Sequence, residues 1–226
     1  DPLRRQRQMC IRDRYKTLGA KFAKWRAVIT PGDNIPTKAC MIANAHALAR
    51  YASICQEVDI VPIVEPEVLM DGSHDINECF EITNETQSIT FEALDKLDVN
   101  FSGIILKPNM VISGTNCEKQ ASVEEIAELT IKCLVNNVPN EVPGIAFLSG
   151  GQSDENASNN LSHINQINTN PWKTTFSYGR ALQLEAMKKW NGNNNNINLG
   201  KSILNKRAKL NSLAAAGKYN LEMENS

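Results

Sequence analysis

The chain has 226 residues, of which 42% are hydrophobic and 22% are charged, as in an ordinary water-soluble globular protein. Its formal net charge of -1 argues against a nucleic acid or an anionic membrane surface as a partner held by bulk charge. No apolar stretch approaches the roughly 20 residues that a membrane-spanning helix needs, so we expect no membrane association.

The first fourteen residues, DPLRRQRQMCIRDR, differ from the rest of the chain, because they carry five arginines and no apolar periodicity. A transit peptide would be poor in acidic residues. An arginine-rich arm that binds nucleic acid would be expected to interleave aromatic residues. We therefore expect residues 1–14 to be disordered or artefactual, the domain to occupy residues 15–219, and a polar tail to follow at 220–226.

The next part of the chain alternates apolar runs with amphipathic segments. Residues 20–29 alternate apolar and polar side chains and predict a strand. The alanine-rich segment after it predicts a closely packed helix that begins at the N-cap Thr37. A second strand is expected over 60–69, and a second helix over 76–97 with a break near Ser88.

The second half of the chain repeats this alternation. Three further strands are predicted, at 103–107, 144–151 and 173–179. Helices are predicted at 122–138, where Ser122 and Glu125 form a capping box, and at 154–168, 180–190 and 201–216. The Asn-rich segment 191–200 is expected to be a solvated loop.

Five successive β–α units predict an α/β fold with a parallel sheet and helices outside it. Strands that end in charged residues or glycine suit a (β/α)8 TIM barrel, whose sites lie at the carboxyl ends of the strands, and a doubly wound sheet is the alternative. A complete barrel needs eight strands and typically about 250 residues. The sequence therefore predicts an incomplete TIM barrel, with about the last five β/α units.

Each predicted strand ends in a side chain suited to catalysis or to phosphate binding. Taken singly, each has an ordinary explanation, such as a paired surface lysine, a solvated turn or a tight connection. Taken together they suggest one site, because a barrel directs all its strand ends into the same bowl. In chain order these residues are Lys24 and Arg26, Glu65 and Glu67, Lys107, then Ser149, Gly150 and Gly151, and finally Ser177, Gly179 and Arg180.

The residue types indicate chemistry on a sugar phosphate. Glycines at the fourth and fifth strand ends would let backbone N–H groups approach an oxyanion, and the helices that follow offer positive dipole ends. Arg180 would add a bidentate donor. Lys107, desolvated and near Lys24, could attack a carbonyl as a neutral amine, with Glu65 passing protons to and from the resulting carbinolamine.

Metal and disulfide chemistry are not indicated. The three histidines are not spaced as metal ligands usually are, so we expect no metal cofactor. Six cysteines are scattered without a CxxC pair, which favours reduced thiols in a cytoplasmic protein.

Five segments, FAKWRAVI, IVPIVEPEVL, GIILKPNMV, PGIAFLSGGQSDENAS and TFSYGRALQ, resemble class I fructose-bisphosphate aldolase in order and separation. The resemblance runs from about Tyr15 to about Tyr219. It implies a barrel that reversibly cleaves fructose 1,6-bisphosphate to dihydroxyacetone phosphate and glyceraldehyde 3-phosphate in glycolysis and gluconeogenesis, without a metal. A different Schiff-base or phosphosugar barrel would require all five segments to match by coincidence.

The resemblance also implies individual roles. Lys107 would form the Schiff base, Glu65 would be the principal acid/base, and Glu67 would polarise the site. Lys24 would assist charge balance and Arg26 would contact the far phosphate of the substrate. The cradle for the phosphate beside the Schiff base is implied at Ser149, Gly150, Gly179 and Arg180.

In the family, the Lys-Trp-Arg strand is the fourth, so the resemblance begins there and the residues on three earlier strands have no counterpart here. We therefore expect an incomplete site in this chain. A catalytically impaired fragment or a non-catalytic binding protein of the same family is the alternative. By analogy the resemblance implies a homotetramer, with cytoskeletal partners in some members.

Overall fold

The computed structural model describes residues 13–225, and its centre is one sheet of five parallel strands. The strands pair in chain order, β1-β2-β3-β4-β5, as in a barrel, whereas a doubly wound sheet reverses its order at a switch point. This order confirms the prediction of an incomplete barrel. The strands are β1 (Phe22–Ile29), β2 (Val61–Val68), β3 (Ile105–Leu106), β4 (Gly144–Phe147) and β5 (Lys173–Phe176).

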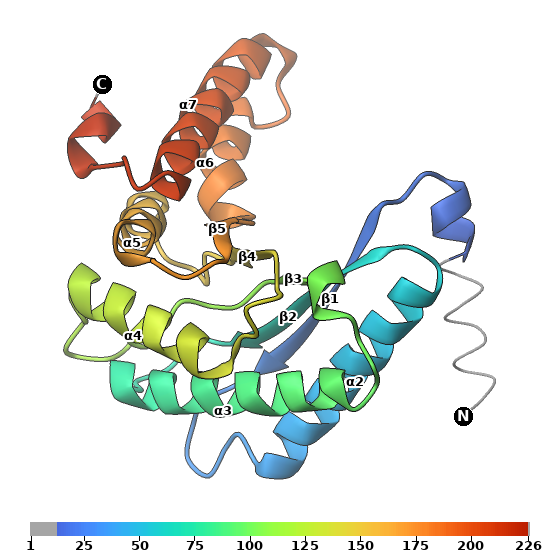
Figure 1. Cartoon of the computed structure of the whole chain (residues 1–226). Helices are drawn as coiled ribbons and strands as arrows, with labels where there is room; N and C mark the ends of the chain where they lie inside the picture. The colour runs from blue at the N-terminus through green and yellow to red at the C-terminus, as the bar shows by residue number, and fades with distance from the viewer. Residues whose placement is uncertain (1–12, 226) are drawn as a thin grey trace.

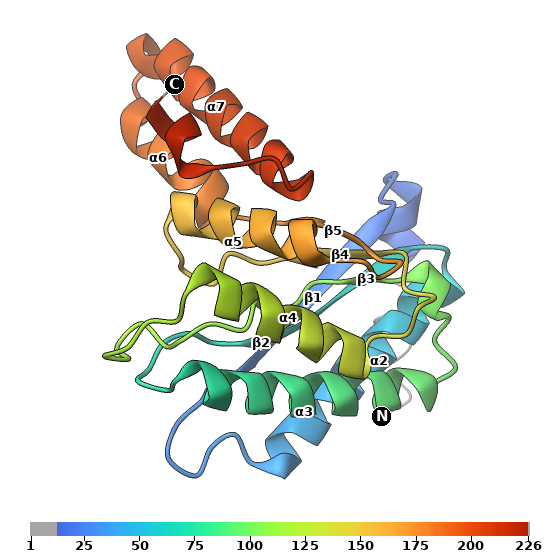
Figure 2. The ribbon, with the colours of Figure 1, turned by 60° about the vertical axis from the view of Figure 1, so that its left-hand side comes forward.

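Helices α2 to α5 cover one face of the sheet, and α6 and α7 lie beyond β5 (Figures 1 and 2). The capping box predicted for the helix at 122–138 and the predicted N-cap Thr37 are both present. The helices are α2 (Lys38–Glu57), α3 (Ile76–Asp95), α4 (Val123–Asn137), α5 (Asp154–Ile167), α6 (Arg180–Trp190) and α7 (Ile197–Ala215). Short 3-10 turns are η1 (Phe101–Gly103), η2 (Asn194–Asn196) and η3 (Leu221–Asn225).

Two helix predictions were wrong in part. The helix α3 has no break at Ser88, because that side chain is exposed while Gln87 and Thr90 beside it pack inward and hold the helix. The segment 191–200 is only partly a loop, since α7 already begins at Ile197. Gly200 is buried there, and a Cβ on it would lie 3.0 Å from the Cβ of Trp190, so this glycine permits close packing of α7 on α6.

The last three strands are shorter than predicted. Phe101–Gly103 forms η1, with Asn100 as its cap, in place of the start of β3. Pro108 has no N–H group to donate to a ladder beyond Leu106. Gly150 and Gly151 have φ of +60° and +86°, which turn the chain away soon after β4. The strands therefore end early, and the candidate residues of the third, fourth and fifth lie on the loops that follow them, except Arg180, which begins α6.

The hydrophobic core lies between the sheet and α2 to α5, where Leu106, Ile145 and Phe147 have no measurable exposure. The opposite face of the sheet is uncovered in the described part of the chain. Phe22, Val28 and Val61 are 63%, 38% and 37% exposed there. Strands β1 and β5 each pair with a single neighbour, so the sheet has two unpaired edges among residues 13–225.

Other sequence predictions concern the thiols, the membrane and the first residues. The five cysteines within the described residues are all free thiols. None of the helices described by the structure is long and apolar enough to cross a bilayer. Residues 13–17 are helical, and Lys16 at this end pairs with Asp59 at 2.5 Å. The rest of the predicted non-domain segment, residues 1–12, lies outside the described part of the chain.

Candidate active site

The centre of the site is a buried ion pair between neighbouring strands. Lys107 follows β3, and its backbone N–H donates to the carbonyl of Val64 at 2.8 Å, which fixes it beside Glu65 on β2. The two side chains are 6% and 2% exposed. Nζ of Lys107 donates to Oε1 of Glu65 at 2.7 Å. A desolvated amine thus lies within direct proton-transfer distance of a carboxylate.

Lys24 approaches the same carboxylate from β1. In the register of β1 on β2, Lys24 lies opposite Ile63, which is two residues before Glu65 on the same face of the sheet. Its Nζ lies 3.4 Å from Oε2 of Glu65, and this oxygen is buried without a hydrogen-bond partner among the described residues. Glu65 therefore lies between two lysines, with Oε1 bonded to Lys107 and Oε2 near Lys24 without a hydrogen bond among the described residues.

A second ion pair joins the same two strands, two residues further along each of them. Nε of Arg26 donates to Oε2 of Glu67, and this hydrogen bond raises the pKa of Arg26. Glu67 is buried, whereas the Arg26 side chain is half exposed on the uncovered face. Lys24 and Arg26 share that face, as their i, i+2 spacing predicts, while Trp25 between them packs on Tyr51 of α2.

The predicted phosphate-binding residues lie after β4 and β5. Backbone bonds from Leu148 to Pro108 (3.1 Å) and from Ser177 to Phe147 (2.8 Å) hold the ends of β3, β4 and β5 side by side. Arg180, the first residue of α6, extends its guanidinium toward the glycine loop. A Cβ on Gly151 would lie 3.5 Å from its Nη2.

The backbone around Arg180 suits an anion. Gly179 is the N-cap of α6 and makes no side-chain capping bond, so the first N–H groups of this helix have no side-chain acceptor at the cap. A Cβ at Gly179 would have no heavy atom within 4 Å among the described residues, so the side-chain position at this cap is open. Ser149, Gly150 and Gly151 lie on the neighbouring loop, and we define these three residues with Ser177, Gly179 and Arg180 as the phosphate cradle.

Comparisons with known proteins show the family to which the chain belongs. The family model described as fructose-bisphosphate aldolase class-I matches residues 5–226. The chain belongs to the class I fructose-bisphosphate aldolase family. The probable class 1 aldolase of Xanthomonas campestris is 53% identical over 208 residues, which cover 92% of this chain and 62% of the relative. Aldolase C of Rattus norvegicus is 49% identical, over 91% of this chain and 57% of the relative.

A solved structure agrees with this assignment. The aldolase of Plasmodium falciparum, in a complex with TRAP and a small-molecule inhibitor, superposes with a TM-score of 0.91 at 44% identity. The match covers 94% of this chain and 62% of that one. The chain thus spans about three fifths of the length of the aldolases it matches.

One residue of this candidate site was missed by sequence reasoning. Asn109 is buried, and its Oδ1 accepts from the backbone N–H of Val68 at 3.0 Å, just after Glu67. Its Nδ2 donates to Thr83 of α3 at 3.1 Å. Asn109 therefore fixes the ends of β2 and β3, which carry Glu65 and Lys107, against each other. An asparagine after a lysine-proline pair gave no periodic or charge signal by which to find it.

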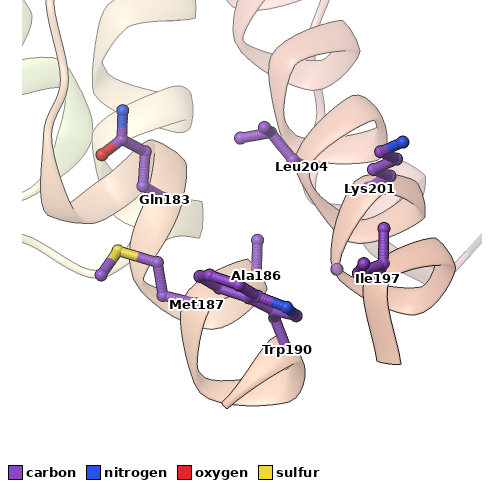
Figure 3. Close-up of a pocket in the computed structure, with 8 residues that line it drawn as sticks. Gln183, Ala186, Met187, Trp190, Ile197, Lys201 and Leu204 are labelled. Atoms are coloured by element: carbon purple, nitrogen blue, oxygen red, sulfur yellow. The ribbon is translucent and has the colours of Figure 1, made fainter. Parts of the chain in front are cut away.

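Two further observations concern metal ligands and a groove away from this candidate site. No cluster of three or more metal-ligating side chains occurs within the described residues. A groove of about 550 Å³ lies between α6 and α7, lined mainly by apolar side chains such as Met187, Trp190 and Leu204 (Figure 3). None of its lining residues belongs to the ion pairs or to the phosphate cradle.

His74, on the loop after β2, predicts a pH dependence of stability. Its ring is buried, and neither nitrogen has a hydrogen-bond partner among the described residues. Desolvation lowers its pKa, against the opposing effect of Glu78 and Asp75. The unfolded chain therefore binds more protons, and the free energy of unfolding should fall as the pH drops below about 6.5.

Denaturant unfolding at pH 7.5 and 5.5 measures this effect. His74→Gln should lose part of the difference between the two pH values, whereas the same substitution at the exposed His46 should keep all of it. An unchanged difference in His74→Gln would contradict the assignment.

Proposed function

We propose that this chain performs class I aldol chemistry, the reversible cleavage of fructose 1,6-bisphosphate to dihydroxyacetone phosphate and glyceraldehyde 3-phosphate. The observation that supports it most directly is the 2.7 Å contact between the buried Lys107 amine and Glu65. A buried lysine needs a partner to offset desolvation, and a carboxylate at this distance can also take its proton. The family assignment gives this pair a substrate class.

The residues can be given a balanced sequence of steps. Glu65 accepts a proton from Lys107, and the neutral amine attacks the ketone carbon to form a carbinolamine. Glu65 returns a proton to the carbinolamine oxygen, which leaves as water and yields the iminium. Glu65, again a carboxylate, accepts the proton of the hydroxyl group on the departing carbon, and the carbon–carbon bond next to the iminium breaks, which releases the aldehyde and leaves an enamine on Lys107. Protonation of the enamine and hydrolysis of the iminium release the ketone.

The surrounding charges serve the two phosphates and the changing charge of the lysine. Lys24, whose Nζ lies 3.4 Å from Oε2 of Glu65, would balance the negative charge of that carboxylate in the steps in which Glu65 is ionised. The phosphate cradle would hold the phosphate nearer the Schiff base. Arg26, fixed by Glu67 and half exposed, would reach the other phosphate. Glu67 would act through Arg26 rather than on the reacting carbons.

Borohydride trapping tests this proposal. Incubation with dihydroxyacetone phosphate and sodium borohydride should reduce the iminium to a stable secondary amine, found on Lys107 by peptide mass spectrometry. Lys107→Arg keeps the positive charge but forms no imine, so it should carry no adduct. Lys96→Arg, on the exposed surface, is the matched control and should be labelled like the parent chain.

Labelling spread over exposed lysines, or equal in Lys107→Arg, would argue against the proposal. That outcome would favour the alternative of a catalytically impaired fragment or a non-catalytic binding protein. A homotetramer, cytoskeletal partners and a cytoplasmic location stay predictions from the family resemblance.

A further inference from the structure

A buried arginine outside the candidate active site links α7 to the phosphate cradle. Arg207 on α7 is only 7% exposed. Its Nη1 donates to Oε1 of Glu224 at 2.7 Å, and its Nη2 donates to Oγ of Ser158 at 2.8 Å. A buried guanidinium is costly unless it is paired and hydrogen-bonded, so its position here calls for a physical role.

The hydrogen bond to Ser158, the fifth residue of α5, reaches the first turn of this helix through the carbonyl of Asp154. This turn begins at Asp154, directly after the cradle residues Ser149–Gly151 and the N-cap Ser153. The Ser158 hydroxyl is fully buried and lies 2.9 Å from the carbonyl of Asp154 and 2.7 Å from Oδ1 of Asn211. Arg207 thus holds the turn through which the glycine loop enters its helix, and α7 lies against α5 in both views (Figures 1 and 2).

The other loop of the phosphate cradle is fixed to the same turn. Tyr178, between Ser177 and Gly179, is buried, and its hydroxyl donates to the carbonyl of Ala157 at 2.8 Å. Ala157 precedes Ser158, so the loop after β5 and the guanidinium of Arg207 hold adjacent residues of α5. Movement of this turn would change the spacing between the glycine loop and Arg180.

Arg207 also offsets negative charge near the cradle. Burial raises the pKa of Asp154. The charge of Arg207 lowers this pKa, whereas the charges of Glu155, Glu185 and Glu224 raise it further. Without the guanidinium, these carboxylates would repel an incoming phosphate at the start of α5. The arginine therefore has two separable effects on the cradle, a geometric one through Ser158 and an electrostatic one through its charge.

We propose that Arg207 is a positioning residue for phosphate binding, which holds the first turn of α5 and neutralises the acidic groups around it. This inference rests on the proposed function, because it takes Ser149–Gly151 and Arg180 as the phosphate cradle. The hydrogen bonds of Arg207 go to Ser158 and Glu224 and to no cradle residue in the described part of the chain, so its effect is indirect.

Hydrogen exchange with and without inorganic phosphate tests the inference without requiring chemistry at Lys107. In the parent chain, phosphate should slow amide exchange at Gly150, Gly151 and the first turn of α5. In Arg207→Met the phosphate concentration for half of this effect should rise about tenfold, as for loss of a charge-assisted hydrogen bond. Lys209→Gln removes an exposed charge from the same helix and should leave this half-saturating phosphate concentration unchanged.

Two conservative variants separate the two effects and cover the case in which Arg207→Met unfolds. Arg207→Lys keeps the charge, and Ser158→Ala keeps the arginine but removes its acceptor, so each should give a smaller rise than Arg207→Met. A purely structural role would speed exchange everywhere and leave the half-saturating phosphate concentration unchanged in all three variants. That result would overturn the inference.

The outcomes for Arg207 and for the proposed function are distinguishable. If phosphate fails to protect these amides in the parent chain, the inference about Arg207 is overturned. This holds even if borohydride traps dihydroxyacetone on Lys107, because dihydroxyacetone has no phosphate and does not need the cradle. If phosphate protects them with the predicted dependence on Arg207 but no adduct forms on Lys107, the inference stands and the proposed function fails.

Discussion

The 226-residue chain should cleave fructose 1,6-bisphosphate at least about a thousandfold more slowly than a chimera that closes its barrel. The chimera would carry, ahead of residue 15, the three earlier barrel strands that the family resemblance implies, taken from the Xanthomonas campestris relative. Enzymatic coupling of the released glyceraldehyde 3-phosphate to NADH formation measures both rates. The comparison uses the same Lys107, Glu65 and phosphate cradle on both sides.

The physical reason is the uncovered face of the sheet. The side chain of Lys24 is 48% exposed and that of Arg26 is 50% exposed, so water screens both charges. An open face also lets solvent reach the iminium and gives the substrate no opposite wall against which to be oriented. Additional strands on the edges of β1 and β5 would exclude water and add contacts from the other side of the bowl.

The same closure should change solubility and stability. Two unpaired edges and the exposed Phe22 and Val28 favour aggregation of the isolated chain. The chimera should show a sharp thermal transition, whereas the isolated chain should melt broadly or precipitate. A chimera that carries Lys107→Arg should have the same thermal transition but no activity, so it separates the effect of barrel closure on stability from its effect on catalysis. Equal cleavage rates in the chain and the chimera would show that the five strands suffice.

Glu65→Gln should lower the rate of adduct formation on Lys107 by roughly 10²–10⁴-fold. The amide keeps the shape of the side chain but cannot take the proton that Lys107 must lose before it attacks a carbonyl. The substitution also leaves a buried ammonium without its carboxylate, at a cost of about 3–5 kcal/mol in stability. The measurement is the time course of borohydride trapping with dihydroxyacetone phosphate, on protein shown to be folded by circular dichroism.

Glu67→Gln is the matched control, because it makes the same chemical change two residues away on β2. Glu67 pairs with Arg26 rather than with Lys107, so its loss should slow trapping by at most about tenfold. Similar losses in both variants would show that general charge, and not proton transfer at Glu65, governs the step.

The sequence predicted the main elements and the central residues because both leave strong local signals. Alternation between short apolar runs and amphipathic segments identifies five β–α units, and parallel strands direct their carboxyl ends to one edge. Lys107 follows from this rule, since it directly follows β3, whereas Glu65 lies within β2, three residues before its end. The five aldolase-like segments then indicated the family, which the family model and relatives at about 50% identity confirm.

Only the tertiary structure showed which residues are in contact. The 2.7 Å bond from Lys107 to Glu65 depends on the register of β2 and β3, and register is set by packing across the sheet rather than by either strand. The start of α7 at Ile197 depends on Gly200 packing against α6, which local composition does not reveal. Asn109 and Arg207 fix strands and helices that are distant in the chain, because buried polar groups take their partners from whatever the fold brings within reach.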